Sequence, residues 1–159
     1  MRGAREPVLG QLKLAWWRER LGEDSGRWPK GEPLLALLRE LPDPGRLVAL
    51  VDGWEGLLAG DGAGFAGLAD GRAAAVAALF GGEAGAMARG WALGTLAGLE
   101  LAGEQRAELD RLIATHSWHR QRLPRALRPL AVLHHFARRA AHGQGGGLAG
   151  AIRLGLIGR

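Results

Sequence analysis

The sequence contains no cysteine and no tyrosine, and its only two serines are Ser25 and Ser117. Without cysteine the chain has no disulfide bond, thiolate metal site or cysteine nucleophile. Neither serine stands in the Gly-x-Ser-x-Gly pattern of a nucleophile elbow. The glycine-rich segments 60–67 and 143–147 lack the Gly-Lys-Ser/Thr ending of a phosphate-binding loop. These absences exclude several common catalytic classes and favour a reducing compartment.

Long apolar runs and a secretory leader are also missing. Residues 1–7 are charged and contain no apolar core, so we expect no signal peptide. The longest stretch without a charged residue, 140–152, is short and glycine-rich, so we expect no membrane span. We therefore predict a cytoplasmic protein that reaches a membrane only peripherally, at its inner face.

Acidic residues are absent from the last third of the chain. All 16 of them lie at or before Asp110, whereas residues 111–159 contain nine arginines and all five histidines. We expect this third to attract phosphates, anionic lipid or an acidic protein surface. The simpler interpretation is a solvated helical surface, because no recognisable nucleic-acid module accompanies the charge.

The apolar residues recur with helical spacing throughout, and no segment alternates with the period of a strand. The length of 159 residues and the 47% apolar content suit one globular domain, 1–159. We predict an all-α domain of seven or eight helices. Their apolar positions run over 8–21, 34–41, 47–58, 65–80, 87–99, 109–116, 130–140 and 148–157.

The histidines are poorly spaced to bind a metal ion. His134 and His135 are neighbours and should point about 100° apart on a helix, so they do not share one ion. His116 and His119 are spaced to face the same way, but no carboxylate follows Asp110 to complete a site. We predict no metal site and no cofactor.

Arg72 stands on an apolar helical stripe, four residues after Leu68 and four before Val76. A guanidinium on a core-facing stripe needs a partner, because an unpaired buried charge costs several kcal/mol. Glu55, at the border of the preceding stripe, is the partner that we expect. The alternative is that Arg72 marks an anion-binding position in a central groove.

Five segments in order resemble the squalene/phytoene synthase family. Residues 6–21, which contain Trp16-Trp17-Arg18, look like its Trp-Trp-Arg helix, the most specific of the five matches. Weaker matches follow at 50–55 (Leu-Val-Asp-Gly-Trp-Glu), 69–81, 88–93, and at Leu123-Pro124 with 128–130. The resemblance implies an all-α isoprenoid-synthase fold. Its enzymes join two prenyl diphosphates head to head, with two aspartate-rich motifs holding Mg²⁺.

The sequence departs from the family where the chemistry should be. The first aspartate-rich motif should precede the Trp-Trp-Arg helix, where only a few residues stand, so we expect a fold that lacks the N-terminal helices. In place of the second motif the chain reads Gly-Thr-Leu-Ala-Gly-Leu-Glu-Leu at 94–101. Glu100, Glu104 and Glu108 have i, i+4 spacing, but Gly103 interrupts them and favours a solvated face. No magnesium site is expected.

The sequence is compatible with three functions. The first is a non-catalytic family member with a binding or assembly role, by analogy with a mitochondrial complex I assembly factor of the same fold. The second is an active prenyl transferase, which would need Mg²⁺. The third is nucleic-acid binding through arginines at 120, 122, 125 and 128.

Without the N-terminal helices, the central cavity should open into an apolar groove. We expect Trp16, Trp17, Trp54 and Trp91 to line it, with Arg18, Glu55 and Arg72 as the polar candidates for contact with an isoprenoid or lipid chain. A groove of this kind is usually covered. We expect a homodimer, a partner helix or a lipid chain to cover it.

Overall fold

The computed structural model describes residues 5–59, 63–118 and 123–157, and every regular element in these ranges is helical. All eight expected helices are present, so the all-α prediction is confirmed. The helices are α1 (Arg5–Gly22), α2 (Pro33–Leu38), α3 (Val48–Ala59), α4 (Ala63–Phe80), α5 (Gly82–Ala97), α6 (Gly103–Thr115), α7 (Arg128–Ala141) and α8 (Leu148–Ile157). Short 3₁₀ turns lie at Ser25–Arg27, Pro44–Leu47 and Arg125–Leu127.

Prolines and glycines set the helix boundaries close to where the sequence predicts them. Pro33 occupies the first turn of α2, and Glu32 caps that helix through the Leu34 amide. The sequence Asp43-Pro44 predicts a cap before the third helix, but Asp43 makes none and instead accepts a bond from Arg46 Nε at 3.0 Å. The pair Asp61-Gly62 predicts a break after the third helix, and it lies outside the described residues.

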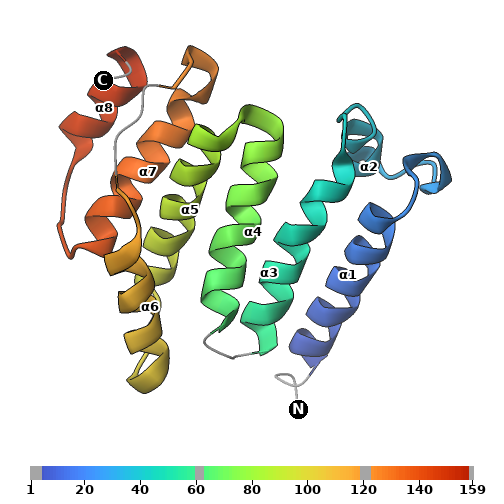
Figure 1. The fold of residues 1–159 in the computed structure, drawn as a ribbon, viewed down its shortest axis with the longest axis horizontal. Helices are drawn as coiled ribbons and strands as arrows, with labels where there is room; N and C mark the ends of the chain where they lie inside the picture. The colour runs from blue at the N-terminus through green and yellow to red at the C-terminus, as the bar shows by residue number, and fades with distance from the viewer. Residues whose placement is uncertain (1–4, 60–62, 119–122, 158–159) are drawn as a thin grey trace.

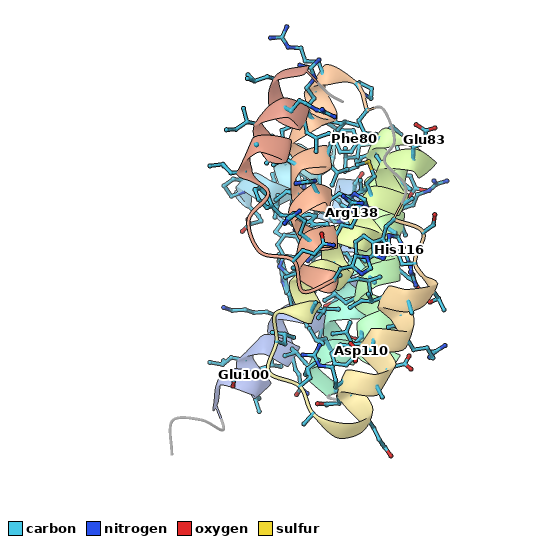
Figure 2. The ribbon with its side chains drawn as sticks, turned by 90° about the vertical axis from the view of Figure 1, so that its left-hand side faces the viewer. Phe80, Glu83, Glu100, Asp110, His116 and Arg138 are labelled. Carbon is cyan, nitrogen blue, oxygen red and sulfur yellow. The ribbon has the colours of Figure 1, made fainter. Side chains whose placement is uncertain are left out.

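Six helices form a single row, in the order α1, α3, α4, α5, α7 and α8 (Figure 1). Each contacts its neighbours in this row, and α4 and α5 occupy the middle. Figure 2 looks along the row from the α8 end and places α6 on one side of it. One face of the row therefore carries α6, and the opposite face lacks this cover.

The closest approach in the row joins α3 to α4 through glycines. A Cβ atom at Gly53 would lie 2.5 Å from the Gly67 carbonyl oxygen, and one at Gly64 would lie 2.5 Å from the Gly56 carbonyl oxygen. Gly71 lies against the Ala49 carbonyl in the same way. Backbone-to-backbone contact of this kind fixes the rotation of both helices about their axes, because a side chain on either contact face would separate them.

Two apolar clusters hold the layer together. The larger joins α4, α5 and α6 around Ala69, Leu93 and Leu109, each with no exposed surface. The smaller joins α1, α2 and α3 around Leu35, together with the buried ring of Trp28. Trp28 donates from its indole nitrogen to the Arg20 carbonyl, which fixes the connection after α1.

No helix within the described ranges is both long enough and apolar enough to cross a lipid bilayer.

Candidate functional site

Arg72 lies on α4 with its guanidinium over the indole ring of Trp91 on α5. The guanidinium carbon is 4.3 Å from the ring centroid, a cation–π contact. The Nη1 nitrogen is buried and has no hydrogen-bond partner among the described residues. Burial lowers the pKa of Arg72 from its usual value, because water is withdrawn from the charge. The site therefore presents a partly desolvated cation with one unused donor.

Glu55, the expected partner of Arg72, pairs with Arg18 instead, so the predicted Glu55–Arg72 ion pair is wrong. Glu55 Oε2 lies 2.7 Å from Arg18 Nη1 on α1. Gly53 faces α4. Glu55 lies two positions later, which rotates it by about 200° around the helix axis from Gly53. The rotation that brings α3 against α4 therefore points Glu55 toward α1 and away from Arg72.

Arg18 joins two of the segments on which the family resemblance rests. Besides Glu55 it binds Asp52, with Nε 2.8 Å from Oδ1. The hydrogen bond to Asp52 raises the pKa of Arg18. About half of each side chain in the Arg18–Asp52 pair is exposed, so we assign the pair at most about 1 kcal/mol of stability. The pair links α1 to α3.

Polar contacts gather on the face of the row that carries α6. Arg18 meets Asp52 there, and Asp70 Oδ1 on α4 lies 2.6 Å from Arg89 Nε on α5. Arg89 also approaches His116, at the end of α6. We call this the ion-pair face.

On the same helices, a second set of residues lies two positions along the sequence from the residues of the ion-pair face. Two positions correspond to a rotation of about 200° around the helix axis, so the second set points to the opposite face of the row. Trp16 precedes Arg18 by two positions, whereas Trp54, Arg72 and Trp91 follow Asp52, Asp70 and Arg89 by two. Phe136 of α7 follows His134, which contacts the His116 and Trp118 rings, by the same interval. These five residues form what we call the tryptophan face: Trp16, Trp54, Arg72, Trp91 and Phe136.

The tryptophan face is apolar and accessible. Trp16, Trp54 and Phe136 are 37%, 40% and 40% exposed, and Arg72 is the only charge among the five. Trp91 is half-buried. A hollow of about 220 Å³ on α1 is lined by Trp16 and Trp17 together with Leu9, Leu12 and Lys13, and not by Trp54 or Trp91. Trp17 packs against the core beneath α2.

A cluster of rings around Gly90 has no counterpart in the sequence-based expectations. The rings of His116, His134 and His142 all pack on Trp118, which donates to the Ile113 carbonyl at 3.0 Å. Gly90 leaves room for them, because a Cβ there would lie 2.7 Å from His116 Nε2. The cluster is assembled from three separate segments, so no local spacing in the sequence predicts it.

His134 and His135 diverge as their adjacency predicts. His134 faces the ring cluster, whereas His135 Nε2 lies 3.2 Å from the Gly147 carbonyl oxygen, beside α8. The described residues include no group of three His, Asp or Glu side chains arranged to hold a metal ion. His119, the predicted companion of His116, lies outside those residues.

The carboxylates of α6 and its approach do not converge. Glu108 binds Arg111 on its own helix, with Oε1 2.7 Å from Nη2, while Glu100 and Glu104 are exposed. The interruption at Gly103 falls where the sequence places it, since α6 begins at that residue. The i, i+4 series is a solvated face, as expected.

No family model, curated protein or solved structure matches this chain.

Proposed function

We propose that this chain is a non-catalytic lipid-binding protein whose tryptophan face holds an isoprenoid or similar chain with an anionic head group. The observation that carries the proposal is the Arg72 guanidinium, half-buried on Trp91 with Nη1 unused. An oxygen of a phosphate or carboxylate would supply the missing acceptor. The flanking indole and phenyl rings would contact the hydrocarbon chain.

Two features favour an isoprenoid-synthase type of fold for this binding role. The Trp-Trp-Arg segment and the Val-Asp-Gly-Trp-Glu segment are joined through Arg18, Asp52 and Glu55, so the two resemblance blocks form one unit. The row of helices leaves the tryptophan face without the cover that α6 gives the other face. In a closed helical barrel of this type, that face would line the central cavity.

A non-catalytic role agrees with how the carboxylates are used. Asp52 and Glu55 are neutralised by Arg18, and Asp70 by Arg89. Mg²⁺ in a diphosphate site needs clustered carboxylate oxygens that are free to coordinate it. Asp52, Glu55 and Asp70 are committed to arginines and point away from Arg72.

The test is binding and turnover of farnesyl diphosphate by the purified chain, with and without Mg²⁺. We expect calorimetric binding without release of diphosphate. Arg72→Met should weaken the binding by about tenfold or more, since a charge-assisted hydrogen bond contributes about 1.5–3 kcal/mol. Arg106→Met, which removes a partly exposed guanidinium from α6, is the matched control and should leave binding unchanged.

Three outcomes would contradict the proposal. Magnesium-dependent release of diphosphate would favour the prenyl transferase alternative. Equal binding of uncharged farnesol would remove the role assigned to the Arg72 cation. Full binding by Arg72→Met would place the ligand elsewhere. Arg72→Met should fold with stability within about 1 kcal/mol of the parent, because it exchanges a weak cation–π contact for relief of desolvation.

A further inference from the structure

Helix α8 carries an apolar stripe on its outward side. Leu148, Ile152 and Leu156 are 67%, 52% and 73% exposed, and their spacing of four residues places them along one side of the helix. The opposite side holds Ala151 and Leu154, both buried. Because α8 ends the row, its outward side has no neighbouring helix in the described structure. Helix α8 lies at the end of the row (Figure 1), and within the described ranges its three large aliphatic side chains are exposed there.

The stripe continues into a groove between α8 and the start of α7. This groove has a volume of about 610 Å³ and is walled by Pro129, Val132, Leu133, Gly155 and Leu156. Arg125 and Arg128 complete its lining. Arg128 Nη1 donates to the Leu156 carbonyl at 2.7 Å, which holds the end of α8 against α7. An apolar channel with guanidinium groups in its wall fits an amphiphile with an anionic head.

The surroundings of the stripe are uniformly basic. Arg153 lies on α8 itself, and Arg138 and Arg139 lie in the last turn of α7. Arg139 Nε donates to the Gly146 carbonyl at 3.1 Å, so the glycine-rich connection 143–147 is tied to α7. No acidic residue follows Asp110 in the sequence. The described residues of α7 and α8 therefore bring arginines and no acidic side chain to the stripe.

We propose that α8 and the groove beside it dock on the surface of an anionic lipid bilayer. Leu148, Ile152 and Leu156 enter the boundary between head groups and acyl chains, and Arg125 and Arg153 contact lipid phosphates. A helix of ten residues is about half the length needed to cross a bilayer, so α8 lies in the plane of the surface. This surface is separate from the tryptophan face, and the inference does not rest on the lipid site proposed there.

The charge at this edge favours an anionic bilayer over a second copy of the chain or a nucleic acid. A second copy of the chain would bring the same arginines together across a symmetric contact, where like charges repel. Nucleic acid would satisfy the arginines but leave the aliphatic stripe exposed to water. An anionic bilayer accepts both the stripe and its basic border.

The experiment is co-sedimentation of the full chain with vesicles of phosphatidylcholine alone and of equal parts phosphatidylcholine and phosphatidylglycerol. We expect binding to the anionic vesicles only, weakening as salt is raised. Ile152→Ser should reduce the partition coefficient about tenfold, because the serine loses the transfer energy of the aliphatic side chain. Arg153→Gln should reduce it about fivefold. Leu37→Ser, at a position 63% exposed on α2, is the matched control and should bind as the parent does.

Three results would each contradict a different part of the bilayer proposal. Equal sedimentation of Ile152→Ser and the parent would show that α8 does not enter the bilayer. Dissociation of a parent dimer by Ile152→Ser, seen by light scattering, would assign the stripe to a second copy. Salt-sensitive binding of RNA with no affinity for anionic vesicles would assign the arginines to nucleic acid. Arg72→Met should retain vesicle binding, so failure of the tryptophan-face proposal is distinguishable from failure of this one.

Discussion

Gly90 is the residue around which the buried histidines are arranged. A Cβ at this position would lie 2.7 Å from His116 Nε2 and 2.8 Å from His134 Nε2. The missing side chain thus brings two imidazole rings, from the end of α6 and the middle of α7, against the same point of α5. The two imidazole rings fill the space beside Gly90, and the Trp118 ring packs against both of them.

This arrangement makes folding stability depend on pH. Burial, and then the charge of Arg89, lowers the pKa of His116 below its ordinary value of 6.5. The groups facing His116 are Arg89 on α5 and His134 on α7, and neither favours its protonation. In acid the unfolded chain therefore binds a proton at His116 before the folded chain does. Stability should be complete above pH 6.5 and decline as pH falls below that value.

Urea unfolding at pH 7.5 and at pH 5.5 tests this expectation. The parent should lose stability at the lower pH, and His116→Gln should lose less, because the glutamine does not titrate. The other histidines remain in the variant and provide the internal control. An equal loss in both proteins would mean that His116 is not responsible.

At the scale of the helix, glycine has opposite effects on isolated and packed elements. A glycine inside a helix costs about 1 kcal/mol relative to alanine, so α3 and α4 are weak helices by themselves. Their contact faces nonetheless use Gly53, Gly56, Gly64, Gly67 and Gly71. The close backbone approach that these residues permit must more than offset their poor propensity.

Substitution of Gly53 separates the two effects. We expect Gly53→Ala to destabilise the chain by about 2–4 kcal/mol, because the new Cβ would collide with the Gly67 carbonyl and the Leu68 backbone. The matched control is Gly82→Ala at the start of α5, where the new Cβ meets nothing within 4 Å. Gly82→Ala should be neutral or stabilise by up to about 1 kcal/mol. Denaturant unfolding measures both, and similar values for the two variants would contradict the packing argument.

The whole molecule is a layer in which each long helix contacts mainly its neighbours. Helices α4 and α5 are held on both sides and beneath by α6, whereas α1 and α8 are held on one side. Local opening at either end of the row therefore breaks fewer contacts than opening in the middle.

Amide hydrogen exchange should follow this order. We expect the slowest exchange around Ala69 on α4 and Leu93 on α5, both without exposed surface, and the fastest among the helices in α8. Mass-spectrometric exchange on the intact chain gives the comparison. Protection of α8 equal to that of α5 would mean that the layer unfolds as one cooperative unit, and it would contradict the expected gradient.

The sequence by itself determined the helices. Helix periodicity, the proline of α2 and the glycines between helices are local signals, because they act within a few residues of the chain. They predicted seven or eight helices, and they placed Arg72 on an apolar stripe. The isoprenoid-synthase resemblance, the magnesium-free binding role and the lipid partner remain proposals.

Only the tertiary structure decided which side chains meet. Glu55 binds Arg18 instead of Arg72 because glycine contacts set the rotation of α3 against α4, and that rotation points the carboxylate toward α1. The cluster of His116, Trp118 and His134 escaped prediction for the same reason, since its members come from distant segments. Helix formation is governed by neighbours in sequence, whereas pairing across helices depends on the axial rotation of each helix, which the packed layer alone fixes.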